Sequence, residues 1–214
     1  MIKNVRRQIL ALLILAPLAF ALQAQPSMYV AGTHYEELPS AVRTADPEKI
    51  EVLEVFWYGC NHCFRFQPLV ENWHQNAPDD VDFIRFPAIW NSLMQVHAQA
   101  YYAAQSLDVV DQVHEEIFNA INLRGNRLQN ENQLATLFAQ NGVDEDAFRQ
   151  AFNSFGVRTR VNQAERRMRD YQIQSTPNMI VNGKYLVVNN QAVNSQQDML
   201  DVVDYLVNRE REAM

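Results

Sequence analysis

This chain of 214 residues contains two cysteines, and both stand where an apolar strand is expected to pass into a helix. The segment Glu51–Tyr58 is rich in β-branched and aromatic residues, as a buried central strand is, and Gly59 ends it. Cys60 and Cys63 follow at a spacing of one helical turn, which brings their Cα atoms close enough for a disulfide bond. This strand, tight turn and helix with paired thiols constrain the fold more than any other segment.

Thiols at this spacing favour redox chemistry over structural crosslinking. A disulfide closing so short a loop would stabilise the fold by only about 2 kcal/mol, against about 4.7 kcal/mol for a hundred-residue loop. Cys60 lies at the expected helix start, where unpaired N–H groups and the helix dipole favour a thiolate, and a protonated His62 adds positive charge. We expect Cys60 to attack or be attacked and Cys63 to resolve the mixed disulfide. The same spacing also occurs in zinc sites.

One carboxylate interrupts the apolar strand. Glu54 lies between Leu53 and Val55, so it should be at least partly buried, with a raised pKa unless it is paired. Strand alternation places it beneath Cys63, where it can exchange a proton with that thiol through water. Arg85, on the next expected strand, is a candidate partner. The alternative is that Glu54 lies on an exposed strand face.

Four further residues stand next to recognisable motifs. Trp57 and Tyr58, the last two residues of the expected strand, either line an apolar substrate groove or simply pack in the sheet. Thr176 and Pro177 come directly before a hairpin. Proline is ordinary as the first residue of a strand, so the residues alone leave a trans peptide bond as the default.

The N-terminus has the pattern of a signal peptide. Three basic residues precede the apolar run Ile9–Leu22, and Ala19-Phe20-Ala21 offers a cleavage site. The apolar run is shorter than the roughly 20 residues that a membrane anchor needs. We therefore expect residues 1–24 to be removed and the rest to be exported to a compartment where disulfides persist. The net charge of −7 argues against a protein that binds nucleic-acid phosphates.

After the signal peptide, the chain contains both strand patterns and helix patterns. After the first strand and helix, Val81–Phe86 alternates like a second strand, and the region from about 91 to 170 reads as helices separated by glycines and contains no proline. Within it Asp144 is an expected N-cap and Gly156 an expected helix stop. The pattern predicts an α/β sheet domain interrupted by an all-helical insertion.

The C-terminal part carries signals for a hairpin and a last helix. Met179–Asn182 and Tyr185–Val188 flank Asn182-Gly183, which favours a type I′ turn. Ser195–Asp198 forms a capping box before an amphipathic helix. We expect domain parts at residues 25–88 and 171–214, with the helical insertion at 89–170.

The remaining conspicuous side chains are expected to be structural. The other histidines do not have the close spacing of a zinc site, so no metal is expected; they are His34, His74, His97 and His114. Several aromatic residues sit on helical patterns and are expected in the core: Trp73, Trp90, Tyr101, Tyr102 and Phe118.

The motifs together resemble those of the DsbA-type periplasmic disulfide oxidases. The resemblance is carried by Phe56–Phe64, by the Thr176-Pro177 pair and by Val181–Tyr185, and it covers essentially the whole chain after the signal peptide. It implies a thioredoxin fold with an inserted all-helical domain. Asn61 stands where the family usually has proline, and Gln67 stands where some members have an acid.

The resemblance also implies roles for the residues singled out above. Cys60 is the accessible nucleophile, Cys63 the resolving thiol and His62 the residue that makes the disulfide strongly oxidising. Glu54 with Arg85 matches a buried acid–base pair. The implied substrate contacts lie at a cis proline, Pro177, at the backbone of Thr176, and at Trp57.

The implied function is that of an exported, monomeric thiol:disulfide oxidoreductase without a cofactor. It would work in the periplasm, pass its disulfide to reduced secreted or outer-membrane proteins, and be reoxidised by a membrane quinone-linked, DsbB-like partner. The alternatives are a reductase or isomerase of the same fold and a chaperone or metal-binding protein in which the cysteines have no redox turnover.

Overall fold

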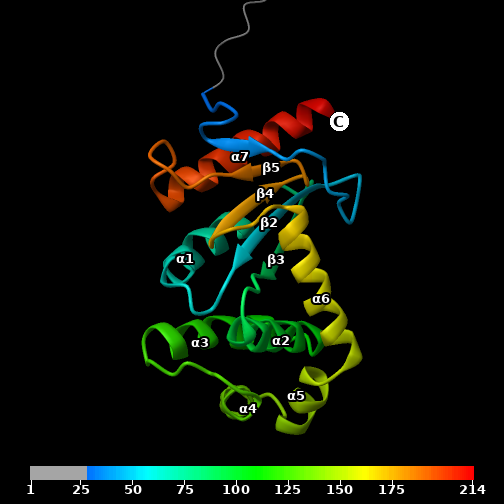
Figure 1. The fold of residues 1–214 in the computed structure, drawn as a ribbon, viewed down its shortest axis with the longest axis vertical. Coiled ribbons are helices and arrows are strands. Elements are labelled where there is room, and N and C mark those ends of the chain that lie inside the picture. The colour runs from blue at the N-terminus through cyan, green and yellow to red at the C-terminus, as the bar shows by residue number, and fades with distance from the viewer. Residues whose placement is uncertain (1–27) are drawn as a thin grey trace, which may run out of the picture.

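The computed structural model describes residues 28–214, which form a mixed five-stranded sheet and seven helices (Figure 1). The sheet has the strand order β1-β5-β4-β2-β3, in which β2 and β3 are parallel and the other neighbours are antiparallel. The strands are β1 (Tyr35–Glu37), β2 (Ile50–Phe56), β3 (Val81–Pro87), β4 (Asn178–Val181) and β5 (Tyr185–Val187).

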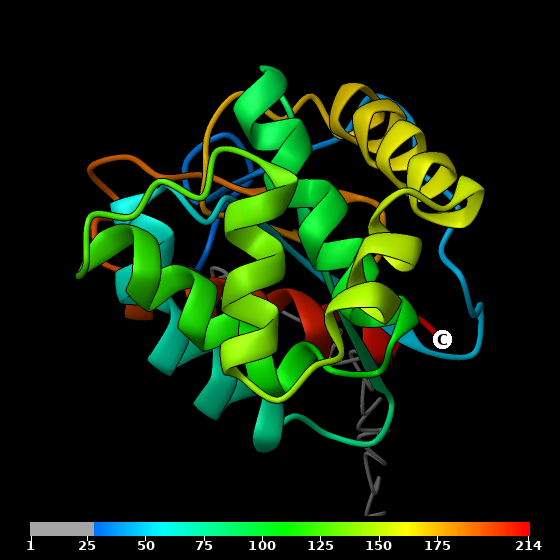
Figure 2. The ribbon, with the colours of Figure 1, turned by 90° about the horizontal axis from the view of Figure 1, so that it is seen from below.

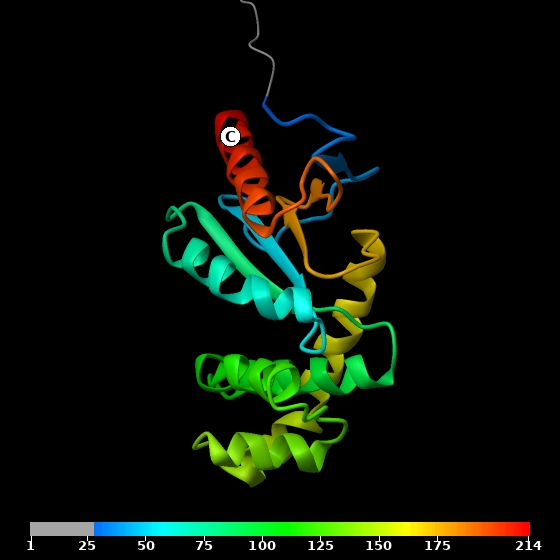
Figure 3. The same cartoon turned by 90° about the vertical axis from the view of Figure 1, so that its left-hand side faces the viewer.

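Helices cover both faces of this sheet. Figure 3 shows α1 (Asn61–Gln75) and α7 (Gln196–Ala213) on one side and α6 (Phe155–Asp170) on the other. Four more helices extend the molecule beyond one end of the sheet, and α4 and α5 are its outermost layer in the view from below (Figures 1 and 2). They are α2 (Ser92–Ser106), α3 (Val110–Asn122), α4 (Glu131–Gln140) and α5 (Glu145–Phe152).

The central strand β2 holds the two layers together. All seven of its residues are buried, and it pairs with β3 on one side and β4 on the other. Ile50 and Val52 pack in the apolar cluster under α1 and α7, whereas Leu53 and Val55 belong to the cluster that continues into the helical block. A strand buried on both faces accounts for the near-continuous apolar sequence.

The structure confirms the predicted order of strands and helices, and with it the thioredoxin fold with a helical insertion. It adds one strand that the sequence did not indicate, β1, a three-residue edge strand with two exposed glutamates. So short a segment has too few residues for an alternating pattern. The division at residues 88–89 and 170–171 stays a prediction.

One expected helix boundary is wrong. Asp144 does cap α5, but α5 ends at Phe152, and Gly156 lies inside α6 instead of stopping the preceding helix. Ser154 provides the physical reason, because its side chain accepts a hydrogen bond from the N–H of Val157 at 3.1 Å and so starts a new helix.

The predicted hairpin and capping box are both present. Asn182 and Gly183 have positive φ angles of 50° and 63°, and the N–H of Lys184 donates to the carbonyl of Val181 at 3.0 Å, as a type I′ turn requires. Ser195 and Asp198 cap α7 reciprocally. The hairpin therefore sets β4, and with it the segment that leads into β4, against β2.

The expected signal peptide, residues 1–24, lies outside the described residues. Within residues 28–214, none of the helices combines the length and the apolar character that crossing a membrane requires.

Gly183 is a testable anchor of this architecture. A Cβ at Gly183 would lie 2.0 Å from the carbonyl oxygen of Val42, so Gly183→Ala adds a backbone clash to the strain of its positive φ. We expect urea denaturation to show a loss of about 3 kcal/mol in the free energy of unfolding. Gly142→Ala is the control, because Gly142 also has a positive φ but open space around it, and it should cost about 1–2 kcal/mol. Equal losses in the two variants would contradict this account.

Candidate active site

Cys60 caps the N-terminus of α1. Its backbone is extended, and its Sγ accepts a hydrogen bond from the N–H of Cys63 at 3.2 Å. The N–H of Cys60 donates to the carbonyl of Trp57 at 3.0 Å, which closes the turn after β2. The sulfur therefore faces the positive end of the helix, as predicted. Both cysteines are free thiols, Cys60 partly exposed and Cys63 fully buried.

The surroundings move the pKa values of the two thiols in opposite directions. A hydrogen bond from the Cys63 side chain is the main reason that the pKa of Cys60 falls to about 5. The Thr176 side chain and the N–H groups of Cys63 and His62 also stabilise the thiolate, while partial burial opposes them. Burial, together with the same shared hydrogen bond, raises the pKa of Cys63 far above its ordinary value. At neutral pH the pair is therefore one thiolate and one thiol.

The segment before β4 closes over the thiolate. The Thr176–Pro177 peptide bond is cis, and the Thr176 carbonyl oxygen lies 3.4 Å from the Sγ of Cys60. The residues alone left trans as the default; the cis bond agrees instead with what the resemblance implies. Thr176 is partly exposed and lies next to the reactive sulfur.

Glu54 is fully buried and paired, as expected. It lies opposite Arg85 in the parallel register of β2 and β3, and its Oε2 accepts a hydrogen bond from Nε of Arg85 at 2.8 Å. The second carboxylate on Arg85 is Glu71, whose Oε2 accepts from Nη2 at 2.9 Å. The alternative of an exposed Glu54 is therefore wrong. Its hydrogen bond goes to Arg85 and not to a cysteine, so its role in proton transfer stays a prediction.

Burial dominates the titration of Glu54. Desolvation raises the pKa of this carboxyl, and the charge and hydrogen bond of Arg85 reduce that rise without cancelling it. The other carboxyl oxygen, Oε1, is buried and has no hydrogen-bond partner in the structure. Glu54 thus keeps a free oxygen on which a proton can be taken up or released.

His62 lies on the surface beside the thiols. Its imidazole is exposed, and its Nδ1 lies 3.1 Å from Nη2 of Arg65, one turn along α1. Its carbonyl accepts a hydrogen bond from the Gln196 side chain, which ties the start of α1 to the start of α7. The structure therefore places His62 next to Cys60, with its backbone N–H towards the sulfur.

Helices α2 and α3 hold Trp57 and Tyr58, two of the three residues between β2 and the cysteine motif. Trp57 Nε1 donates to Nδ1 of His97 at 3.0 Å, and the Tyr58 hydroxyl is 2.8 Å from Nδ1 of His114. The side chain of Asn122 also donates to the carbonyl of Tyr58 at 2.9 Å. We call these three contacts the loop clamp. They link the helical block to the turn that carries Cys60.

Sequence reasoning missed the loop clamp. His97 and His114 were expected to lie on the surface or to be partly buried with their polar atoms satisfied; both are buried, with 1% and 6% exposure. In the sequence, the only feature that sets these two residues apart is that they are the histidines of the helical block. Burial lowers the pKa of both, that of His114 to about 3, so both rings are neutral and can accept hydrogen bonds from Trp57 and Tyr58.

The expected aromatic core is mostly present, with one correction. Tyr101, Tyr102 and Phe118 are buried, and Trp73 is partly buried against the cluster under α1 and α7. Trp90 is 47% exposed because it lies in the connection from β3 to α2 and not inside a helix. In residues 28–214 no group of three or more His, Cys, Asp or Glu side chains is gathered as a metal site would need.

Comparison with protein families and curated proteins gives a consistent result. The DSBA-like thioredoxin domain matches residues 80–201. The chain is 38% identical over 213 residues to the thiol:disulfide interchange protein DsbA of Azotobacter vinelandii, covering 97% of this chain and 99% of that protein. It is 37% identical to the protein of the same name from Pseudomonas aeruginosa, covering 95% of each.

Solved structures show the same relationship. The crystal structure of Pseudomonas aeruginosa DsbA is similar with a TM-score of 0.83 and 37% identity, covering 86% of this chain and 96% of that one. The oxidoreductase NmDsbA1 from Neisseria meningitidis is similar with a TM-score of 0.76 and 26% identity, covering 86% and 95%.

The buried carboxylate can be tested through the resolving step. In a Glu54→Gln variant the side chain cannot take a proton from Cys63, so closure of the Cys60–Cys63 disulfide from a Cys60–glutathione mixed disulfide should slow about 100-fold near neutral pH. Rapid acid quenching measures that closure. Glu71→Gln is the control, because Glu71 contacts the same Arg85 from a more exposed position. An unchanged rate and pH profile in Glu54→Gln would remove this role.

The loop clamp can be tested with His97→Phe. Loss of the acceptor for Trp57 should loosen the turn whose carbonyl holds the N–H of Cys60, so alkylation of Cys60 by iodoacetamide at pH 6 should slow several-fold as less thiolate is present. Leu134→Ala, buried in α4, is the control: it should cost about 2–5 kcal/mol of stability and leave the alkylation rate unchanged. Equal rates in both variants would show that the clamp only stabilises the fold.

Proposed function

We propose that this chain, which belongs to the family with a DSBA-like thioredoxin domain and is a thiol:disulfide oxidoreductase, acts as an oxidase. It donates the disulfide between Cys60 and Cys63 to reduced, folding proteins. The observation that carries this proposal is the position of Cys60 at the start of α1, where its Sγ accepts a hydrogen bond from the N–H of Cys63 and its surroundings lower its pKa to about 5. A reduced form stabilised in this way makes the disulfide easy to give away, because the two forms are thermodynamically linked.

The transfer takes place in two exchange steps. A substrate thiolate attacks Sγ of Cys60, the Cys60–Cys63 bond breaks, and Cys63 leaves as a thiolate that takes up a proton. A second substrate thiol then loses its proton and attacks the substrate sulfur of the mixed disulfide, so that Cys60 leaves as a thiolate. Two electrons pass from the substrate dithiol to the cysteine pair, and the substrate gains one disulfide.

Residues around the pair assist these steps. Glu54, with Arg85, supplies the proton that Cys63 takes up in the first step and accepts it when the reaction runs in the other direction. The backbone N–H of His62 helps to hold the leaving thiolate of Cys60, and its imidazole, when protonated, adds positive charge. This division of work is supported by the full burial of Glu54 and the exposure of His62.

The substrate binds as an extended segment. The substrate backbone pairs with the backbone of Thr176, which lies beside Cys60. The neighbouring cis-Pro177 holds the substrate segment in place. Trp57, half-buried beside the turn, contributes an apolar contact. Main-chain pairing of this kind fits unfolded substrates of varied sequence, because it uses groups that every polypeptide has.

The cellular compartment and the partners of the protein are inferred from the sequence and from this chemistry. We assign the protein to the periplasm on the signal-peptide pattern of residues 1–24, and its substrates to reduced secreted or outer-membrane proteins. Each turnover leaves a dithiol, so an electron acceptor must restore the disulfide; a membrane quinone-linked, DsbB-like protein is the proposed reoxidant. The protein acts as a monomer and needs no cofactor.

A reductase or isomerase of the same fold is the second candidate. A reductase needs a reduced form that gives up electrons readily, which is the opposite of a stabilised Cys60 thiolate. A chaperone or metal carrier would not need two thiols whose pKa values are driven apart. Both alternatives are tested by the next experiment.

The reduced protein should unfold at higher denaturant than the oxidised protein. Cys60 has a folded-state pKa of about 5, below that of an unfolded thiol at about 8.5, so its stabilising effect is lost as the pH falls towards 5 and grows as the pH rises to about 8.5. Above that range Cys63 acts in the opposite sense, because its raised pKa keeps it protonated only in the folded state. Urea titrations of both forms from pH 5 to 8 measure the difference. An oxidised form that is the more stable would indicate a reductase, and a zinc-dependent transition would indicate a metal carrier.

Replacing Cys63 should trap the intermediate. We expect a Cys63→Ala variant whose Cys60 carries a thionitrobenzoate group to form covalent complexes with reduced periplasmic proteins on non-reducing gels, because a substrate thiolate attacks Sγ of Cys60 and displaces thionitrobenzoate. Without the Cys63 thiol, the resulting mixed disulfide cannot be resolved from within the protein. A Cys60→Ala variant is the control and should trap none. Complexes formed equally by both variants would contradict the assignment of Cys60 as nucleophile.

A further inference from the structure

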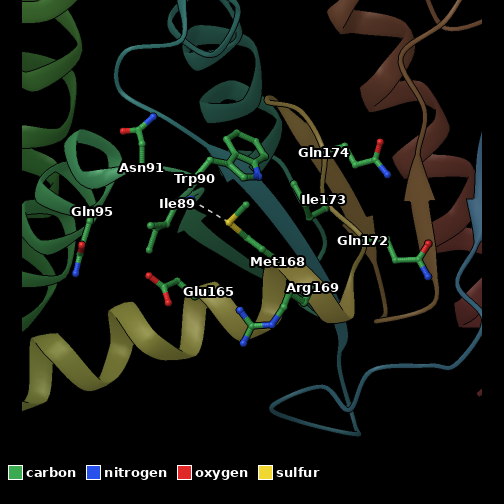
Figure 4. Close-up of a pocket in the computed structure, with 10 residues that line it drawn as sticks. All are labelled: Ile89, Trp90, Asn91, Gln95, Glu165, Met168, Arg169, Gln172, Ile173 and Gln174. Carbon is green, nitrogen blue, oxygen red and sulfur yellow. Dashed lines mark hydrogen bonds between the residues drawn. The ribbon is translucent and has the colours of Figure 1, made fainter.

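An open pocket of about 620 Å³ lies next to the segment that leads to Thr176. Three parts of the chain enclose it: the connection from β3 to α2, the last turns of α6, and residues 172–174 (Figure 4). Its apolar wall consists of Ile89, Trp90, Met168 and Ile173.

Trp90 is the unusual member of this wall. It is 47% exposed, whereas Met168 and Ile173 are only 4% and 5% exposed. Figure 4 shows the Trp90 indole beside Met168 and Ile173, and the sulfur of Met168 accepts a hydrogen bond from the N–H of Ile89 at 2.9 Å. The wall is therefore held in place on the protein side, and the open ring face of Trp90 is available to a partner.

The rim of the pocket is polar but carries little net charge. Four amide side chains surround the apolar wall, and one acid and one base lie on its α6 side. The amides are Asn91, Gln95, Gln172 and Gln174; the charged residues are Glu165 and Arg169. An aromatic side chain fits such a site best, because its face packs on indole while amides accept or donate at its edge. Neither charge sign is favoured.

The position of the pocket indicates where such a side chain comes from. Thr176 lies at Cys60, and Gln174 comes two residues before it in the chain. Two residues of fully extended chain span at most about 7 Å, and the backbone bends at Ser175 and Thr176, so the pocket begins within about 7 Å of Thr176. A substrate strand antiparallel to residues 174–176, with its cysteine at Cys60, passes over the pocket two or three residues after that cysteine.

We propose that the pocket around Trp90 is a substrate subsite that receives an aromatic side chain two or three residues C-terminal to the reacting cysteine. The subsite rests on the proposed function, because the same extended substrate occupies Thr176. It gives the protein a preference among reduced polypeptides that backbone pairing alone does not supply.

The test uses monothiol peptides and a Cys63→Ala background in which Cys60 carries a thionitrobenzoate group. The peptide thiolate attacks Sγ of Cys60 and releases thionitrobenzoate, which is followed by absorbance. Two peptide pairs differ only in Phe or Ser, at the second or the third position after the cysteine. Every rate is divided by the rate of the same variant with glutathione. In one of the two pairs Phe should react about 10-fold faster than Ser.

Variants of the protein test whether the pocket around Trp90 causes this preference for Phe over Ser. Trp90→Ala should reduce it to less than about 2-fold, and Trp90→Phe, which keeps an aromatic face, should retain most of it. Phe155→Ala is the matched control, because Phe155 is 77% exposed on the same helix as Met168 but about 20 Å away along its axis, and the preference should survive there.

A second measurement covers the case in which Trp90→Ala does not fold. Gln95→Glu places a negative charge on the rim, so a peptide with Asp at the preferred position should react several-fold more slowly relative to Ser than it does with the Gln95 protein. Equal rates for Phe and Ser in both pairs, or a preference that Trp90→Ala leaves intact, would overturn the subsite. Oxidation of dithiothreitol by the protein with both cysteines tests the proposed function separately.

Discussion

The hydrogen bond shared by the two thiols is the interaction on which the rest of this structure depends. Cys63 is fully buried one turn inside α1, and its thiol and backbone N–H both point to the Sγ of Cys60. A buried thiol resists losing its proton, and a thiol at a helix N-terminus loses it easily. The shared hydrogen bond, together with the burial of Cys63, therefore drives the two pKa values apart. This asymmetry supports the proposal that Cys60 is the thiol that exchanges with substrate and Cys63 the thiol that resolves the mixed disulfide.

The fold supports that contact from three sides. Strand β2 delivers the turn, and its buried Glu54 lies on the face that α1 covers. The hairpin of β4 and β5 holds the segment with Thr176 against Cys60, with the carbonyl oxygen 3.4 Å from Sγ. Helices α2 and α3 grip Trp57 and Tyr58 through the loop clamp. The helical insertion thus helps to build the candidate site, because it fixes Trp57 and Tyr58 in the turn before the cysteine motif.

Much of this was predictable from sequence because it depends on local pattern. The buried strand, the turn at Asn182-Gly183 and the capping box at Ser195 each follow from a few adjacent residues. Burial of Glu54 followed from its apolar neighbours, and Arg85 on the next expected strand was a candidate partner. The parallel register that sets the two residues opposite each other came from the structure. The rest depends on contacts between distant segments. His97 lies 40 residues from Trp57, and nothing in either segment indicates their hydrogen bond. Trp90 was expected in the core because a single sequence does not show that its segment is a loop, and Gly156 was expected to stop a helix that Ser154 in fact starts.

The most direct test of the central claim is an ultraviolet titration of the reduced protein, in which thiolate absorbance is followed from pH 3 to pH 9 with a Cys60→Ala variant as blank. The account predicts a single transition with a midpoint at about 5 that the blank lacks. A midpoint near 8.5, the value of an ordinary cysteine, would contradict it.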